Sequence, residues 1–184
     1  MSATIFSDTT WHDAAAHPLK DTLNAPLQSW LQDPGSLTRR LQQQFTGFNV
    51  QVLRHQAAPL SPDEQAQIAP WNAHQTQCRE VLLCSATAPV VYARSIIPQA
   101  DTGLLHRLQH IGTQPLGEAL FTEPDITIGP FQWAYFAPTS ALGLLNQQLT
   151  GTRRALWGRR RSFFVDNNPV LVAEVFLSTA PCYE

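Results

Sequence analysis

Two apolar segments, each divided by a turn signal, constrain the fold of this 184-residue chain more than any other feature. Residues 79–98 read "REVLLCSATAPVVYARSIIP", with an apolar run on each side of "ATAP". Residues 160–178, "RRSFFVDNNPVLVAEVFLS", repeat this pattern around "DNNP". Short runs rich in Val, Ile, Leu and Phe that flank a turn are typical of antiparallel β-hairpins. The sequence therefore predicts two such hairpins.

Short helical patterns lie before and between the hairpins. Thr102 can cap a helix over "GLLHRLQHI", and the segments "QPLGEALF" and "ALGLLNQQL" also look helical. Antiparallel strands interspersed with short helices indicate an α+β fold with a single antiparallel sheet, rather than alternating parallel βαβ units. Because the chain has 184 residues, of which 43% are hydrophobic, we expect one domain over residues 1–184.

The charge and composition of the chain argue against several classes of partner. A formal net charge of -2 provides no overall field to attract nucleic acid or an anionic membrane. No apolar run approaches the ~20 residues of a membrane span and the N-terminus lacks a basic, apolar leader, so we expect a cytoplasmic protein.

The three scattered cysteines do not suggest a disulfide framework. His106 and His110 share a helical spacing, but no carboxylate accompanies them, so we expect no metal site.

The basic run at residues 153–161, "RRALWGRRR", places five arginines around Trp157. Such a run can bind nucleic acid. The net acidity of the chain instead favours a solvated loop that leads into a strand.

Residues 24–47, "NAPLQSWLQDPGSLTRRLQQQFTG", contain two helical patterns separated at Pro34 and Gly35. Ser36 is a good N-cap for the second helix. The pair can be two helices packed on the core, a mobile lid or a DNA reader. The net charge counts against the DNA reader, which leaves packed helices or a lid.

Three charged side chains stand in strands that are otherwise apolar. Strand periodicity places Glu174 in a segment that is apolar on both faces, so its carboxyl group needs a cationic or hydrogen-bonding partner. Arg79 and Arg94 alternate with apolar residues in the first hairpin and can project from neighbouring strands. One interpretation is a structural ion pair between Glu174 and one of these arginines. The other is a sheet face that binds a small organic acid between guanidinium forks.

Several motifs of the chain, in this order, resemble bacterial chorismate pyruvate-lyases: "REVLLC", "ARSIIP", "LGEALFT", "LWGRRR" and "VLVAEVFL". The resemblance runs from Leu27 to Tyr183 and leaves residues 1–25 as an N-terminal extension. It implies an antiparallel sheet of about six strands with surrounding helices. It also implies an internal ligand site beneath a helical flap.

The resemblance also implies roles for individual residues. Arg79 would hold the ring carboxylate of the ligand, and Glu174 would lie at the opposite end of the ring, near the hydroxyl group. Leu116 matches a position whose backbone contacts the ligand. Leu37, in the flap motif "SLTRR", stands where a methionine is common. Arg94 is a further candidate for binding a substrate carboxylate.

The implied reaction converts chorismate to 4-hydroxybenzoate and pyruvate, the first step of ubiquinone synthesis, without a cofactor. It depends on positioning and electrostatics, and both concerted and stepwise elimination remain open. We expect a monomer whose partners are chorismate and 4-hydroxybenzoate, with no nucleic acid bound. The rival is a non-catalytic effector-binding module of the same fold, which the short segment of about 25 residues before the resemblance disfavours. A chorismate-using enzyme with another product is a third possibility.

Overall fold

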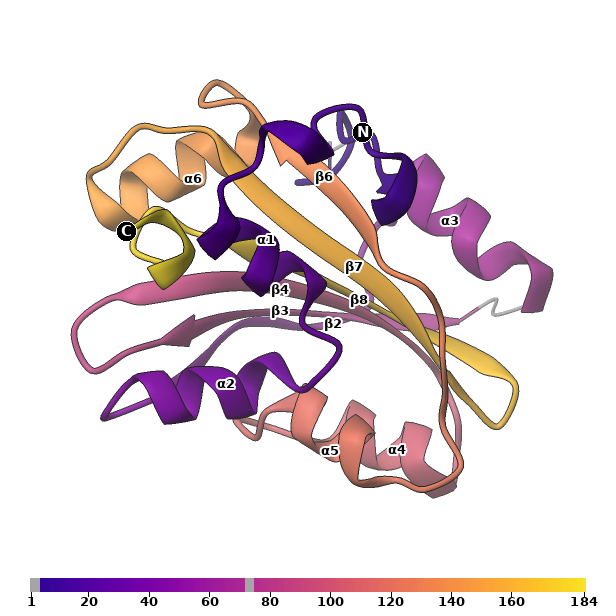
Figure 1. Cartoon of the computed structure of the whole chain (residues 1–184). Coiled ribbons are helices and arrows are strands. Elements are labelled where there is room, and N and C mark those ends of the chain that lie inside the picture. Colours follow the sequence, from indigo (N-terminus) through magenta and orange to yellow (C-terminus); the bar gives the residue numbers. More distant parts are fainter. Residues whose placement is uncertain (1–3, 72–74) are drawn as a thin grey trace.

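The computed structural model describes residues 4–71 and 75–184, and these residues form one antiparallel sheet of eight strands. Seven strands follow one another in the order β1-β6-β7-β8-β4-β3-β2, and β5 pairs with β7 beside this path. Along that order the strands are β1 (His12–Asp13), β6 (Gln132–Phe136), β7 (Leu156–Val165), β8 (Asn168–Phe176), β4 (Pro89–Pro98), β3 (Thr76–Cys84) and β2 (Asn49–Gln56), with β5 at Thr127–Ile128. Figure 1 shows the long strands β7, β8, β4 and β3 crossing the centre of the molecule.

The two predicted hairpins are confirmed as β3–β4 and β7–β8. In the second hairpin Asp166 and Asn167 have φ angles of 48° and 61°, the left-handed conformation that the tightest hairpin turns require and that Asn and Asp tolerate. The α+β class with a single antiparallel sheet is also confirmed. The number of strands is larger than the expected six because β1 and β5 add two residues each to the sheet edge.

Helices cover both faces of the sheet. One face carries α1 (Ala25–Gln32), α2 (Leu37–Gln44), α4 (Gly103–Gln109) and α5 (Leu116–Thr122). We call it the α1/α5 face, and Figure 1 shows α2, α5 and α4 in a row along it. The other, the α3/α6 face, carries α3 (Pro62–Ile68) and α6 (Ala141–Thr150). The short 3-10 helices are η1 (Ala14–Ala16), η2 (Lys20–Thr22), η3 (Ala69–Trp71) and η4 (Pro181–Tyr183).

Strand alternation divides the apolar core between the two faces. Val81 and Leu83 pack beneath α1 and α2, whereas Leu82 and Tyr92 belong to the cluster beneath α6. Successive side chains of a strand point to opposite sides of the sheet, so central strands that are covered twice have to be apolar at nearly every position. This requirement explains the continuous apolar runs in the sequence.

The helix pair α1–α2 is tied to the core by its own apolar side chains. The side chains of Asn24 and Ser36 cap the two helices by accepting hydrogen bonds from the backbone N–H groups of Leu27 and Arg39. Five side chains of the pair are buried against the sheet: Leu27, Trp30, Leu31, Leu37 and Leu41. Each such burial contributes about 1.5–3 kcal/mol, so the pair is packed on the core in this structure. The lid interpretation stays a prediction. No helix in the described part of the chain is long and apolar enough to cross a membrane.

Candidate active site

The register of the central strands places Arg79 and Glu174 on the same α1/α5 face. Arg79 lies opposite Ser95 of β4, and Glu174 of β8 lies opposite Ala93 of that same strand. The two charged residues are thus two strands apart and offset by two residues along the strands. Ideal sheet spacings give a Cα separation of ~12 Å, enough for a para-substituted benzene ring with a hydrogen bond at each end. The small side chains of Ala93 and Ser95 leave room between them.

The Arg79 guanidinium is buried and is not neutralised by a carboxylate in the described residues. Its Nη2 donates hydrogen bonds of 3.0 Å to the backbone carbonyls of Gly112 and Gln114, and its Nε is buried without a partner. Burial lowers the pKa of Arg79 to about 10, because a charge is costly to remove from water. Arg79 therefore has a spare donor and an unbalanced charge for an anion. Leu116 begins α5 two residues after Gln114, which places its backbone near this guanidinium.

His55 of β2 lies opposite Arg79 and shares its surroundings. Its Nε2 is buried without a hydrogen-bond partner in the part of the chain that the structure describes. Burial lowers the pKa of His55, and the positive charges of Arg79 and His110 lower it further. A neutral imidazole beside Arg79 can hydrogen-bond a ligand without adding charge.

Glu174 forms an ion pair with Arg159, which lies opposite it on β7. The Arg159 Nε is 2.8 Å from Glu174 Oε2, and both side chains are largely buried. The Arg159 Nη1 also donates to the backbone carbonyls of Trp30 and Asp33, at 2.9 and 2.8 Å, where α1 ends. A cation at the C-terminal end of a helix is favourable because it meets the negative end of the helix dipole. Arg159 thus links Glu174 to the α1–α2 pair. The expectation that Arg79 or Arg94 would pair with Glu174 is wrong, because the residue opposite Glu174 is Arg159 on β7 and Ala93 on β4.

An enclosed cavity lies between Glu174 and the helices of the α1/α5 face. Its volume is about 20 Å³, room for about one water molecule. The α1–α2 pair contributes Gly35 and Leu37, and α5 contributes Gly117. The rest of the lining comes from Phe121, Phe131, Arg159, Arg160, Arg161, Phe163, Val172 and Glu174. The structure therefore brings Leu37 and Glu174 to one cavity, on the face that also carries Arg79.

Comparison with known proteins identifies the family of the chain. The family model described as chorismate lyase matches residues 5–184. The chain belongs to the chorismate lyase family. Two relatives named probable chorismate pyruvate-lyase, from Shewanella sp. (strain ANA-3) and Aromatoleum aromaticum, are 40% and 39% identical. The matches cover 88% of this chain in both cases, and 84% and 90% of the relatives. A third, from Pseudoalteromonas atlantica, is 35% identical over 96% of this chain and 90% of its own length. The family resemblance read from the sequence is confirmed.

A solved structure shares the fold of this chorismate lyase family member without close sequence similarity. The effector domain of PhnF from Mycobacterium smegmatis superimposes with a TM-score of 0.53 and 15% sequence identity. The match covers 78% of this chain and 89% of that domain. At this identity the similarity shows the fold alone.

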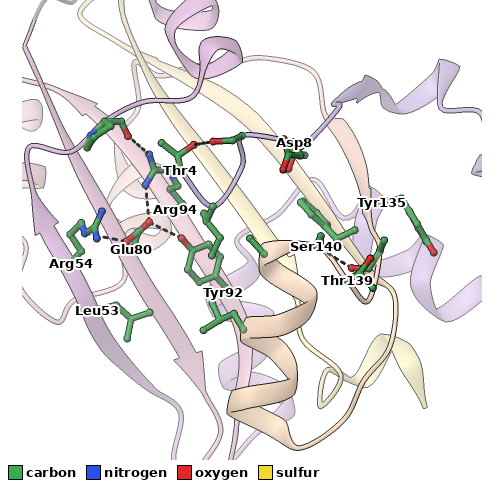
Figure 2. Close-up of a pocket in the computed structure, with 18 residues that line it drawn as sticks. Thr4, Asp8, Leu53, Arg54, Glu80, Tyr92, Arg94, Tyr135, Thr139 and Ser140 are labelled. Carbon is green, nitrogen blue, oxygen red and sulfur yellow. Dashed lines mark hydrogen bonds and ion pairs between the residues drawn. The ribbon is translucent and has the colours of Figure 1, made fainter. Parts of the chain in front are cut away.

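The structure corrects the expectation that Arg94 projects beside Arg79. Arg94 lies opposite Glu80, and therefore on the α3/α6 face. Its side chain is 1% exposed, and it pairs at 2.7 Å with both Glu64 and Glu80. Figure 2 shows Arg94 beside Glu80, which also accepts a hydrogen bond of 2.9 Å from the Tyr92 hydroxyl. Although burial disfavours its charge, the hydrogen bonds and charge of Glu64 raise the pKa of Arg94. In this chorismate lyase family member Arg94 is a structural ion-pair residue on the far side of the sheet.

A groove of about 750 Å³ on the α3/α6 face is larger than the cavity at Glu174. Figure 2 draws the residues that line it, including Glu80, Tyr92 and Arg94. The charges within it balance one another, since Arg54 also approaches Glu80, at 3.4 Å. Size alone therefore does not mark the site. The smaller cavity combines Leu37 and Glu174 with Arg161, a lining arginine that forms no salt bridge among the described residues.

The basic run at residues 153–161 is a loop that leads into a strand, as expected, and Arg153 in the loop is exposed. Its last three arginines, Arg159 to Arg161, are buried in β7, so the expectation that they are solvated is wrong. β7 lies between β8 on one side and β6 and β5 on the other, and helices cover both of its faces. Alternation sends the side chains of Arg159 and Arg161 to the α1/α5 face. The side chain of Arg160, although the residue is part of the cavity lining, points to the other face and pairs with Asp63. Sequence reasoning missed Arg159 and Arg161 as site residues. The available signal was strand period: two arginines separated by one residue share a face.

Proposed function

We propose that the protein is a chorismate pyruvate-lyase, which converts chorismate to 4-hydroxybenzoate and pyruvate. The observation that carries this proposal is the pair Arg79 and Glu174, set on one sheet face with an enclosed, largely apolar cavity against Glu174. Membership of the chorismate lyase family and the names of the relatives support the reaction.

Each of the residues has a defined task in this proposal. Arg79 binds the ring carboxylate through donors that the protein leaves unused, and the adjacent backbone at Leu116 contributes to the same contact. Glu174 hydrogen-bonds the ring hydroxyl at the other end. Leu37 covers the ring from α2. A ligand held at both ends in a cavity without bulk water is restricted to one orientation, which is where positioning contributes most to catalysis.

The reaction is an elimination that makes the ring aromatic. The C3–O bond breaks, and its electron pair leaves with enolpyruvate. The C4–H bond also breaks, and its electron pair completes the aromatic ring. The proton ends on the methylene carbon of the leaving group to give pyruvate. Overall the step is neither oxidation nor reduction, and it needs no cofactor. In a stepwise elimination Glu174 acts as a base or as a hydrogen-bond acceptor. In a concerted elimination the hydrogen passes directly to the enolpyruvyl methylene carbon through a cyclic transition state, and Glu174 only orients the ring.

The α1–α2 pair is the proposed flap over this site. A cavity with room for one water molecule has to open before an aromatic acid can enter. Arg159 holds the turn between the two helices through Trp30 and Asp33, and Arg161 holds it through a hydrogen bond of 2.8 Å to the Pro34 carbonyl. These contacts can break and re-form as a unit, because they come from two residues on the same face of one strand, Arg159 and Arg161.

The wider setting follows from the same proposal. The reaction supplies 4-hydroxybenzoate to ubiquinone synthesis in the cytoplasm. A single domain over residues 1–184, acting as a monomer, contains all of the proposed site residues.

Incubation of the purified protein with chorismate, without added metal or nucleotide, tests the function. The expected result is pyruvate and 4-hydroxybenzoate in equal amounts, with no effect of EDTA. Tight binding of the aromatic acid without turnover of chorismate would favour an effector-binding module instead. A different aromatic product would also contradict the proposal.

A further inference from the structure

Arg161 is a buried cation of the cavity that the proposed function leaves without a ligand role. The residue is 8% exposed, and its guanidinium carbon lies 4.2 Å from the ring centre of Phe131, 5.0 Å from Phe163 and 5.2 Å from Phe121. Aromatic faces attract a cation, but they replace its hydration only in part. Burial lowers the pKa of Arg161 to about 10, and the charge of Arg159 adds to this effect.

The protein uses only part of the hydrogen-bonding capacity of Arg161. Its Nη2 donates to the Pro34 carbonyl, and no Asp or Glu of the described ranges 4–71 and 75–184 forms a salt bridge with it. The carboxylates whose charge reaches it, Glu174 and Asp33, are themselves held by Arg159 and Arg40, at 2.8 and 2.9 Å. A planar guanidinium with unused donors and no salt bridge is suited to bind the carboxylate of a ligand through two parallel hydrogen bonds.

The charges on the α1/α5 face fit a dianion better than a monoanion. Glu174 neutralises Arg159, which leaves Arg79 and Arg161 without a carboxylate among the described residues. His55 adds no charge near neutral pH because its pKa is lowered. Chorismate carries two carboxylates, one on the ring and one on the enolpyruvyl group. The product 4-hydroxybenzoate keeps only the ring carboxylate.

Arg79 and Arg161 stand at opposite ends of one row across the sheet. The row runs from Arg79 through Ser95 and Val172 to Arg161, so all of these side chains point to the same face. Three strand spacings put the Cα atoms of the two arginines ~14 Å apart, and Glu174 lies on the strand next to Arg161. A ring held at its two ends by Arg79 and Glu174 can bind in two orientations, related by a half-turn about the line between those ends. In one of them C3, the carbon next to the one that carries the hydroxyl group, faces β7. That carbon carries the enolpyruvyl group in chorismate.

We infer that Arg161 binds the enolpyruvyl carboxylate of chorismate and makes the cavity selective for the dianionic substrate over its monoanionic product. This inference rests on the proposed function. The contact fixes the side chain of the substrate while the C3–O bond breaks, and it is lost when pyruvate leaves. Because Arg161 also bonds the Pro34 carbonyl, the same guanidinium connects the substrate to the α1–α2 turn.

The test separates binding of the second carboxylate from binding of the ring. The variants are Arg161→Met and Arg161→Lys, with Arg153→Met as the control because Arg153 is an exposed arginine before β7. The ligands are 4-hydroxybenzoate and 3-(carboxymethoxy)-4-hydroxybenzoate, a stable diacid with a carboxylate on the side arm. Their dissociation constants are measured by calorimetry, and kcat/KM for chorismate is measured in parallel.

The inference predicts that Arg161→Met changes the dissociation constant of the diacid but not that of 4-hydroxybenzoate. Arg161→Met weakens diacid binding and lowers kcat/KM on the order of 100-fold, because a buried charge-assisted contact is lost. Binding of 4-hydroxybenzoate and the melting temperature do not fall. Arg161→Lys restores part of the loss, since an ammonium group supplies the charge without the planar fork. Arg153→Met behaves as the wild type.

Two results would overturn the inference. Equal weakening of both acids would mean that Arg161 only holds the cavity closed, and unchanged diacid binding would mean that it does not touch the second carboxylate. Failure of the proposed function is seen separately, as a wild-type protein that binds both acids and leaves chorismate intact. The difference between the two acids still tests Arg161 in that case.

Discussion

The buried arginines on the two faces of the sheet differ in their partners. On the α3/α6 face Arg94 lies between Glu64 and Glu80, and Arg160 pairs with Asp63. Each of these guanidiniums has a carboxylate from the protein itself. They hold α3 to the sheet, since Asp63 and Glu64 both belong to that helix.

Of the buried arginines on the α1/α5 face, Arg159 alone has such a partner within the described part of the chain. Arg79 and Arg161 are also buried, but backbone carbonyls and aromatic rings surround them. A buried charge without a counter-charge costs stability. The comparison therefore separates arginines that the protein itself pairs from the two for which we propose a bound anion, although both kinds look alike in sequence.

Loss of a paired arginine should have the largest effect. Arg94→Met leaves the buried Glu64 without its cation and Glu80 with only the more distant Arg54, and should lower the free energy of unfolding by about 3–5 kcal/mol. Chemical denaturation measures this change. Arg54→Met is the matched control, because the half-exposed Arg54 contacts Glu80 at 3.4 Å and should contribute at most about 1 kcal/mol. Equal stability of the two variants would remove the distinction between the faces.

Loss of an unpaired arginine should affect binding and leave the fold intact. Arg79→Met should weaken binding of 4-hydroxybenzoate on the order of 100-fold, because the ring carboxylate loses a charge-assisted contact in a cavity with little water. The unfolding free energy should stay the same or rise. Arg79→Lys should recover part of the affinity. Wild-type affinity in a folded Arg79→Met protein would show that the carboxylate binds elsewhere.

The sequence shows which charged residues stand in apolar strands, but it does not predict reliably which face of the sheet each of them occupies. The hairpins follow from apolar runs around turn signals, and strand period correctly groups Arg79 with Val81. The relative face of Arg79 and Arg94 depends on the register between β3 and β4, where a shift of one residue would bring them together. That register includes an irregularity at Leu83 and Cys84, which the turn "ATAP" does not reveal.

Burial of the run "LWGRRR" also could not be predicted from the local sequence, because it depends on how the strands pair. Arginine is exposed in most proteins, so a basic run favours a solvated interpretation. β7 becomes a central strand only because β6 and β5, which the sequence did not predict as strands, pair with it across the sheet. Such non-local pairing also sets the Arg159–Glu174 contact. The family resemblance, in contrast, singled out Arg79, Glu174 and Leu37 as candidates without any knowledge of register, and the structure places all three on the α1/α5 face.

Ligand binding should protect one face of the molecule more than the other. If α1 and α2 form a flap, saturating 4-hydroxybenzoate should slow amide hydrogen exchange over residues 36–45 by about tenfold, equivalent to ~1.4 kcal/mol. Residues 141–150 of α6, on the opposite face, serve as the internal control. Exchange that slows equally in both helices would indicate general stabilisation, and unchanged exchange in α2 would mean that the helices are fixed packing.

Thermal unfolding with and without 4-hydroxybenzoate tests the distinction between paired and unpaired arginines most directly. At a hundredfold excess over its dissociation constant, the ligand should raise the melting temperature of the wild type by about 5–10 °C. Arg94→Met should melt at a lower temperature than the wild type and still be stabilised by the ligand. Arg79→Met should melt at or above the wild-type temperature in the absence of ligand and gain almost nothing from it. The account would be contradicted if Arg79→Met lost stability as Arg94→Met does and retained the full stabilisation by the ligand.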